Sequence, residues 1–178
     1  AALGTGTQVD WEIIHGNNPL LVNEVLATVM DEKLRQVGGV SYTEAEREWA
    51  ERISLTLGSA AKPLDVAQMI SPYRKSLGYG STDVGDVSWA TPTVGVRTAT
   101  WVPGTSAHSW QAVAASGHSI GYKGTMVAAK AMTLMAVELF TNSALRDAAR
   151  IEFDAARGPQ YQYRSLLGNR GPPLDYRK

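Results

Sequence analysis

Residues 80–124 have the sequence GSTDVGDVSWATPTVGVRTATWVPGTSAHSWQAVAASGHSIGYKG, and a long apolar run, TMVAAKAMTLMAVELFT, follows directly at 125–141. This stretch holds two of the three histidines of the chain, His108 and His118, among glycines and small polar residues. Its centre, TVGVRTATWV at 93–102, lies between two prolines and is rich in β-branched residues, which is typical of a strand. Histidine is a common metal ligand and general base, and sites are often built on loops between regular elements, so we expect the functional residues here.

The bulk composition excludes several classes of partner. Lysine plus arginine (17) equals aspartate plus glutamate (17), which gives no electrostatic reason to expect a nucleic acid or an anionic membrane surface as partner. The chain has no cysteine, which excludes disulfides and thiolate metal sites and predicts a reducing, cytoplasmic location. The most apolar segment, residues 126–140, is interrupted by Lys130 and Glu138 and falls short of the ~20 residues of a membrane span.

Hydrophobic spacing divides the first part of the chain into one strand and two helices. Apolar and polar residues alternate over residues 7–14, which predicts a strand with one solvated face. Helical spacing then runs over residues 21–37 and ends at two glycines. A second helix is expected to start at Thr43, because Thr43 and Glu46 have the spacing of a capping box, and to end at Gly58.

The second part is predicted to contain one strand and two further helices. Residues 59–80 are expected to form a connection with short helical turns, and residues 125–141 a helix that is apolar nearly all round and therefore buried. Ser143 is expected to cap a helix that ends near Arg157, and an irregular tail follows from Gly158. The two strands, 7–14 and 93–102, cannot satisfy their backbone groups alone, so we expect further strands from chain outside this sequence or from a partner.

The run Gly117 to Gly121 matches G-x-S-x-G, the nucleophile motif of α/β-hydrolases. In that fold a histidine follows the serine along the chain, and no histidine follows Ser119 here. The residues before the motif also make a poor buried strand. A glycine-flanked turn is therefore favoured over a serine hydrolase.

His108 is the first candidate metal ligand. It lies in the glycine- and serine-rich sequence GTSAHSW, just after the predicted strand, and this position suits a ligand as well as it suits a structural histidine. Asp83 and Asp86 lie three residues apart. Such a pair usually caps a helix or forms a turn, and the alternative is that its carboxylates hold a metal ligand in position. His15 follows the first strand directly and is expected to be a surface or packing residue.

The runs GSTDVGDVSWATPTVGVRTATWVPGTSAHSWQ and KGTMVAAKAMTLMAVELF resemble the C-terminal part of a metallopeptidase family. That family contains the aminoacylases, the carboxypeptidase G enzymes and the amidohydrolases of N-acyl amino acids. The stretch TGTQVDWEIIHGNNPLLVNEVLATVMDEKL also resembles the closing strand and helix of the inserted lid domain of the family. The resemblance implies an α/β fold, with the end of an α+β lid (dimerisation) domain at residues 1–58 and the C-terminal part of a two-metal catalytic domain at residues 59–178.

The function implied by this resemblance is that of a metal-dependent amidohydrolase acting on a small N-acyl amino acid such as p-aminobenzoyl-glutamate. Family members bind two divalent ions (zinc, or manganese or cobalt), which activate water beside a glutamate that acts as general base. The last metal ligand of the family matches His108, and His118, which lies nearer the apolar helix, is the alternative. Positions close to the ions or substrate are expected at Ser81, Asp83, Asp86 and Thr105.

The resemblance also implies that this chain alone is inactive. The other ligands and the general base of the family lie in the first half of its catalytic domain, which this sequence does not contain, so no catalytic residue is assigned to this chain. Counting ligands agrees, because a two-metal site needs about five of them and three histidines with two nearby aspartates are a thin supply. We expect the missing half and a second copy, bound through the lid, as partners. The alternative is a non-catalytic dimerisation module derived from such an enzyme, which would not need His108.

Overall fold

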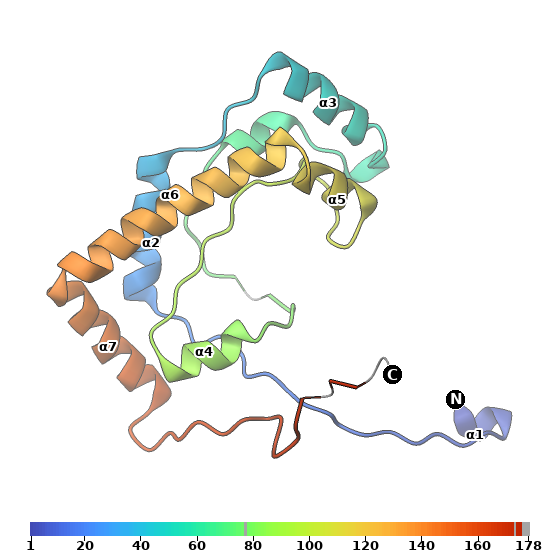
Figure 1. Cartoon of the computed structure of the whole chain (residues 1–178), viewed down its shortest axis with the longest axis vertical. Coiled ribbons are helices and arrows are strands. Elements are labelled where there is room, and N and C mark those ends of the chain that lie inside the picture. The colour runs from blue at the N-terminus through green and yellow to red at the C-terminus, as the bar shows by residue number, and fades with distance from the viewer. Residues whose placement is uncertain (77, 173, 176–178) are drawn as a thin grey trace.

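A computed structural model describes residues 1–76, 78–172 and 174–175. Its regular elements are all helical (Figure 1). They are α1 (Ala2–Thr5), α2 (Glu24–Val37), α3 (Glu44–Ser54), α4 (Val84–Ala90), α5 (Trp110–Ser116), α6 (Ser119–Thr141) and α7 (Ser143–Arg157), with short 3₁₀ turns at Gly58–Ala60 and Leu64–Gln68.

The expected α/β fold is wrong for this chain. Neither residues 7–14 nor residues 93–102 form a strand, and the described residues contain no sheet. The physical reason is that alternation and β-branched residues favour an extended backbone, whereas a strand also needs a second segment to complete its hydrogen-bond ladder. Among the described residues, no hydrogen bond joins the backbone groups of residues 94–101 to any other residue.

The helix ends follow local signals that the sequence carries. Asn23 caps α2, its side chain accepting a hydrogen bond from the Leu26 N–H at 3.0 Å. The capping box of Thr43 and Glu46 is confirmed, although α3 ends at Ser54, before Gly58. The cap of α7 is Asn142 rather than the expected Ser143.

Helix α6 differs from its prediction in length and in burial. It begins at Ser119, six residues earlier than expected, and its buried residues lie on one side only, among them Gly124, Ala131 and Met135. The opposite side is exposed to solvent, so the prediction that this helix is buried all round is wrong. By length and composition α6 could cross a membrane, although the core helix of a soluble protein passes the same test.

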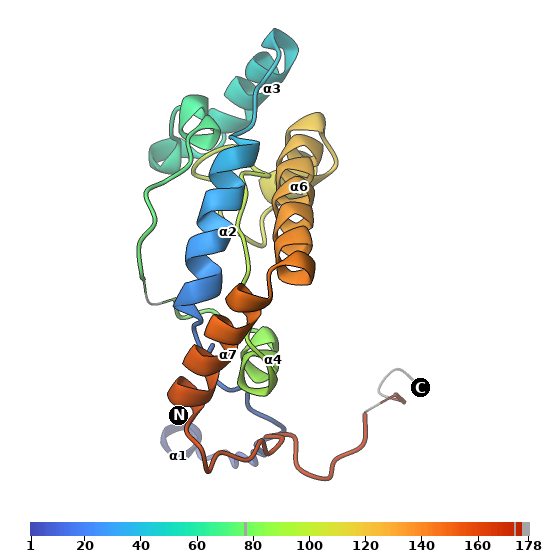
Figure 2. The same ribbon diagram turned by 90° about the vertical axis from the view of Figure 1, so that its left-hand side faces the viewer.

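Two clusters of buried side chains hold the helices together. In the first, α2 packs along α6 and α7, as two perpendicular views show (Figures 1 and 2). Its buried members are Leu26, Met30, Ala131, Met135, Leu145 and Ala149. The second joins α3 to the start of α6 through Ala50, Ile53, Val102 and Ile120. Both clusters draw on residues from either side of residue 58, and the proposed domain division at that position stays a prediction.

Candidate functional site

His108 lies on the loop between the extended segment 93–102 and α5. Its side chain is exposed, and its φ of 59° is the one positive φ of a non-glycine residue within the described parts of the chain. A left-handed backbone costs most L-residues roughly 1–2 kcal/mol, and such strain often occurs at functional sites. His108 therefore differs from His15 and His118 in its backbone conformation.

The loop that carries His108 is anchored at both of its ends. Gly104 has a φ of 95°, and a Cβ atom there would lie 2.0 Å from the Ala60 carbonyl oxygen, so only glycine fits. Next to it, the Lys62 N–H donates to the Pro103 carbonyl at 3.3 Å. Beyond the loop, Gln111 Nε2 donates to the Thr56 hydroxyl at 3.2 Å. The segment after α3 therefore holds the His108 loop in place.

Thr105 lies within the same loop and its hydroxyl oxygen is buried. Among the described residues this oxygen has no hydrogen-bond partner. A buried hydroxyl without a partner is unfavourable and usually has a structural or functional reason. Thr105 lines a hollow of about 570 Å³ that runs along the extended segment from Arg97 to Ala107.

His118, the alternative ligand, is engaged in packing. Its ring stacks on that of Trp49, with the centroids 4.1 Å apart and the planes 8° from parallel. Its Nδ1 atom also accepts a long hydrogen bond (3.4 Å) from the Ile120 N–H and so caps α6. Packing and capping therefore engage the Nδ1 atom and one face of the His118 ring.

The residues at 81–86 bind the chain's own N-terminal segment. Asp86 accepts hydrogen bonds from the side chain of Asn18 at 2.7 Å and from the Tyr163 hydroxyl at 3.2 Å. The hydrogen bond from the Asn18 side chain is the main reason that the pKa of Asp86 is lowered. The Ser81 hydroxyl accepts from Asn17 Nδ2 at 3.0 Å, and Asp83 precedes α4 without a capping hydrogen bond. Asp86 thus holds distant segments together, rather than capping a helix or forming a turn.

The described residues do not by themselves fit a two-metal centre. No group of three or more histidine, aspartate or glutamate side chains comes together among them. His108 and Thr105 share one loop, whereas Ser81 and Asp83 precede α4 and Asp86 lies within it, in a separate part of the fold (Figure 1). A metal ion held by His108 would need its other ligands from outside these residues.

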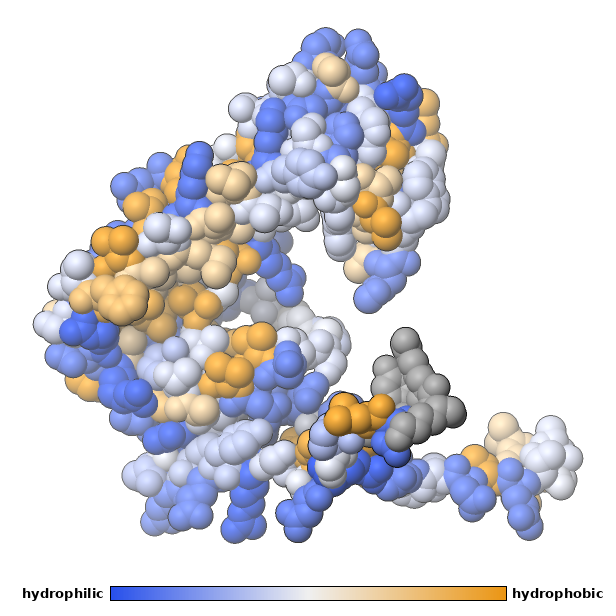
Figure 3. Space-filling model, in the orientation of Figure 1, coloured by the Kyte–Doolittle hydropathy of each residue, from blue (hydrophilic) through white to orange (hydrophobic). Residues whose placement is uncertain are grey.

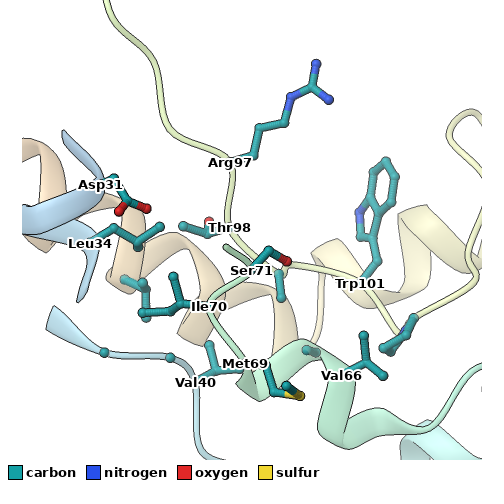
Figure 4. Close-up of a pocket in the computed structure, with 16 residues that line it drawn as sticks. Asp31, Leu34, Val40, Val66, Met69, Ile70, Ser71, Arg97, Thr98 and Trp101 are labelled. Carbon is teal, nitrogen blue, oxygen red and sulfur yellow. The ribbon is translucent and has the colours of Figure 1, made fainter. Parts of the chain in front are cut away.

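The sequence patterns did not single out Arg97 and Trp101. Both line a cavity of about 450 Å³ between α2, residues 66–71 and residues 97–103. In Figure 4 the two side chains project from the same side of the extended segment, away from Val40 and Met69. The sequence could have indicated this pair, because residues four positions apart in an extended segment lie on the same face. The cavity borders the backbone groups of residues 94–101 that have no partner among the described residues.

Comparison with known proteins gives a distant relative. No protein-family model matches the chain, and no solved structure matches it. A p-aminobenzoyl-glutamate hydrolase subunit from Escherichia coli (strain K12) is 29% identical to it over 170 residues. The match covers 82% of this chain but only 35% of the relative, so the chain spans about a third of the length of that protein.

The residues at 80–140 were found to resemble amidohydrolases of N-acyl amino acids. The similarity to a p-aminobenzoyl-glutamate hydrolase subunit confirms this resemblance. The match links the chain to a hydrolase, as the motifs indicated. Over most of its own length the chain is similar to a subunit of the p-aminobenzoyl-glutamate hydrolase.

Proposed function

We propose that this chain is part of a metal-dependent amidohydrolase that cleaves N-acyl amino acids such as p-aminobenzoyl-glutamate. The observation that carries the proposal is His108, an exposed histidine with a left-handed backbone on an anchored loop. Similarity to a hydrolase subunit named for that substrate supports it.

In this proposal His108 supplies one nitrogen ligand from the chain. Its exposure leaves the ring accessible, and the anchoring of Gly104 and Pro103 fixes the start of the loop from which it projects. The buried Thr105 hydroxyl is a candidate to hydrogen-bond a group that completes the site. The remaining ligands and the general base come from the part of the enzyme outside this chain.

The first test is the activity of the isolated 178-residue chain. We expect no release of p-aminobenzoate from p-aminobenzoyl-glutamate, and no free amino acid from other N-acyl amino acids, with zinc, manganese or cobalt added. The reason is the absence of a complete ligand cluster among the described residues. Turnover that co-purifies with the chain and depends on added metal would contradict this expectation.

The second test compares the two histidines in a longer polypeptide that carries the rest of the enzyme. His108→Ala should lower kcat by orders of magnitude and reduce bound metal, because it removes a ligand. His118→Ala should cost at most ~10–100-fold, as is typical for a residue that supports the ligands. If His118→Ala loses metal and turnover while His108→Ala keeps both, His118 is the ligand and the assignment is wrong.

A non-catalytic dimerisation module is the second candidate. The observation in its favour is the N-terminal segment 7–14, whose apolar side chains Val9, Trp11 and Ile13 are 69–79% exposed. Such a module would still form its dimer and carry out its role after His108→Ala. The amidohydrolase would lose its turnover in the same variant. The same variant therefore separates the two functions.

A further inference from the structure

The hollow of about 570 Å³ along the extended segment combines one cation with one aromatic side chain. Among the described residues that line it, Arg97 carries the only charge and Trp101 is the only aromatic residue. Figure 3 shows that the molecule is hollowed between α4 and α5, the two helices that the extended segment joins. The volume lies within the range of small-molecule sites, which is roughly 300–1,000 Å³. The lining therefore suits a small ligand with an anionic part and an aromatic part.

The guanidinium of Arg97 is available for an anion. Its side chain is exposed and forms no ion pair within the described parts of the chain. The acid that lines the neighbouring cavity, Asp31, is already engaged, because Arg35 donates to its two carboxylate oxygens at 2.8 and 3.1 Å. A guanidinium binds a carboxylate through two parallel hydrogen bonds, which are stronger than those between neutral groups. Arg97 is therefore suited to hold the carboxylate of a ligand.

Trp101 is half-buried and is held by its polar edge. Its indole N–H donates to the Ser116 hydroxyl on α5 at 3.4 Å, a long hydrogen bond that orients the ring. Its side chain projects from the same side of the extended segment as that of Arg97 (Figure 4). Aromatic rings attract one another in offset or edge-to-face arrangements. Trp101 is therefore suited to bind a planar aromatic group of the ligand that Arg97 holds.

The backbone between Arg97 and Trp101 offers hydrogen bonds to an amide. Its N–H and C=O groups have no partner among the described residues. Four residues of extended chain separate the two Cα atoms by about 13 Å, so both side chains can reach the two ends of one small molecule. An amino acid joined through one amide to an aromatic acid has its groups in the matching order. Its amide can pair with an extended backbone as a short strand does.

We propose that this hollow binds the substrate of the hydrolase, an N-acyl amino acid with an aromatic acyl group. Arg97 holds a carboxylate of the amino acid, Trp101 stacks on the acyl ring, and the backbone between them bonds the amide. The inference rests on the proposed function and names the residues of this chain that select the substrate. The hollow extends to Thr105 and Ala107 on the loop of His108, so its occupant lies beside the proposed metal ligand.

The test measures binding of three ligands to the isolated chain by titration calorimetry, with EDTA present so that metal ions play no part. The first is p-aminobenzoyl-glutamate, which has both the carboxylates and the ring. The second is its diamide, in which both carboxylates are replaced by uncharged carboxamides. The third is N-acetylglutamate, which keeps the carboxylates but has no ring. We expect the first to bind at least about tenfold more tightly than either of the others, because only it uses both side chains.

Two variants assign the two ends of the ligand. Arg97→Gln should weaken binding of p-aminobenzoyl-glutamate by at least about tenfold and leave binding of the diamide unchanged, because only the charged hydrogen bonds are lost. Trp101→Leu should weaken p-aminobenzoyl-glutamate and leave N-acetylglutamate unchanged. The matched controls are Arg52→Gln on α3 and Trp110→Leu on α5, which change exposed residues outside the hollow. A change in the fold would weaken all three ligands together, so selective loss identifies direct contact.

Absent binding, equal binding of the three ligands or an equal loss in the control variants would overturn the inference. A longer polypeptide that carries the rest of the enzyme separates this outcome from failure of the proposed function. There Arg97→Gln should raise KM for p-aminobenzoyl-glutamate with a smaller change in kcat. Turnover with an unchanged KM would refute the role of Arg97 and leave the proposed function standing. Selective binding by the isolated chain without any turnover by the longer polypeptide would refute the proposed function instead.

Discussion

His108 and His118 are both followed by serine, yet they occupy different environments. His118 caps α6 through its Nδ1 atom and stacks one face of its ring on Trp49. His108 is exposed and held in a left-handed conformation. Side-chain type and the following residue are the same, and the two residues differ in backbone conformation, exposure and the partners that the fold brings to them.

Because their environments differ, replacing His118 and replacing His108 should change the free energy of unfolding by different amounts. His118→Ala should lower the free energy of unfolding by about 1–3 kcal/mol, through loss of a helix cap and of ring stacking. His108→Asn should change it by less than about 0.5 kcal/mol, because asparagine tolerates a left-handed backbone and the site is exposed. Urea unfolding followed by circular dichroism measures both variants. A larger loss for His108→Asn than for His118→Ala would contradict this account.

Glu46 is the buried acid whose titration should control stability at low pH. Burial alone would raise its pKa, but hydrogen bonds from Lys123, Ser119 and Thr43 outweigh burial and lower the pKa from 4.5 to about 2. The Lys123 ammonium lies 2.6 Å from its carboxylate. A lowered pKa means that the folded state prefers the ionised form, so the stabilisation is complete above pH 4.5 and is lost as the pH falls towards 2.

We therefore expect the free energy of unfolding of the parent chain to fall between pH 4.5 and pH 2. Glu46→Gln should be about 1–2 kcal/mol less stable near neutral pH, because the half-exposed Lys123 loses a charged hydrogen bond. The variant should also lose less stability in the acid window, since glutamine keeps the capping box but does not titrate. Urea titrations at several pH values measure this difference. Parallel pH profiles would show that Glu46 is not the controlling group.

At the scale of elements, the extended segment 93–102 lies directly against α6. Gly124 makes this approach possible, because a Cβ atom there would lie 2.1 Å from the Ala99 carbonyl oxygen. Val94 and Val96 pack on the core formed by α2, α6 and α7. One side of the segment is thus partly buried by helices, while the backbone groups of residues 94–101 have no partner among the described residues.

Replacing Gly124 tests this contact. In a free helix alanine would be more stable than glycine by about 1 kcal/mol, but here the added methyl group must push the Ala99 backbone away from α6. We expect Gly124→Ala to be destabilised by about 1–3 kcal/mol, as for an overpacked core. Gly117→Ala is the matched control, since its nearest atoms would lie at 3.9 Å. Thermal unfolding compares them, and a stabilised Gly124→Ala would refute the close approach.

At the scale of the whole molecule, the N-terminal segment extends away from the packed helices (Figure 1). Its anchor lies at residues 17–21, where the Leu21 N–H donates to Ser88 at 2.8 Å and Trp89 Nε1 donates to the Pro19 carbonyl at 2.7 Å. The apolar side chains before that anchor are left in solvent. Exposed apolar surface of this kind favours association with another chain.

We expect the isolated chain to form a dimer or larger species at micromolar concentration through residues 7–37. Trp11→Asp should shift the equilibrium towards monomer by at least about tenfold, because it places a charge among Val9 and Ile13. Trp110→Asp, which changes an exposed tryptophan on α5, is the control and should have little effect. Sedimentation equilibrium gives the result. A strictly monomeric parent chain at high concentration would count decisively against self-association.

The sequence alone determined the features that depend on neighbouring residues. The capping box of Thr43 and Glu46, the helix ending near Arg157 and the similarity to a hydrolase were all predictable. Caps are formed by residues three positions apart, so no distant contact is needed to recognise them. Similarity in residues 80–140 likewise needs only the order of the amino acids.

Features that need distant partners could not be predicted from the sequence and depend on the three-dimensional fold. Whether residues 93–102 form a strand depends on a second segment, and the described residues provide none. The roles of Asp86 and His118 depend on Asn18 and Trp49, which lie far away along the sequence. Apolar residues around α6 indicate that it can be buried, but which of its sides is covered is set by the packing of α2 and α7.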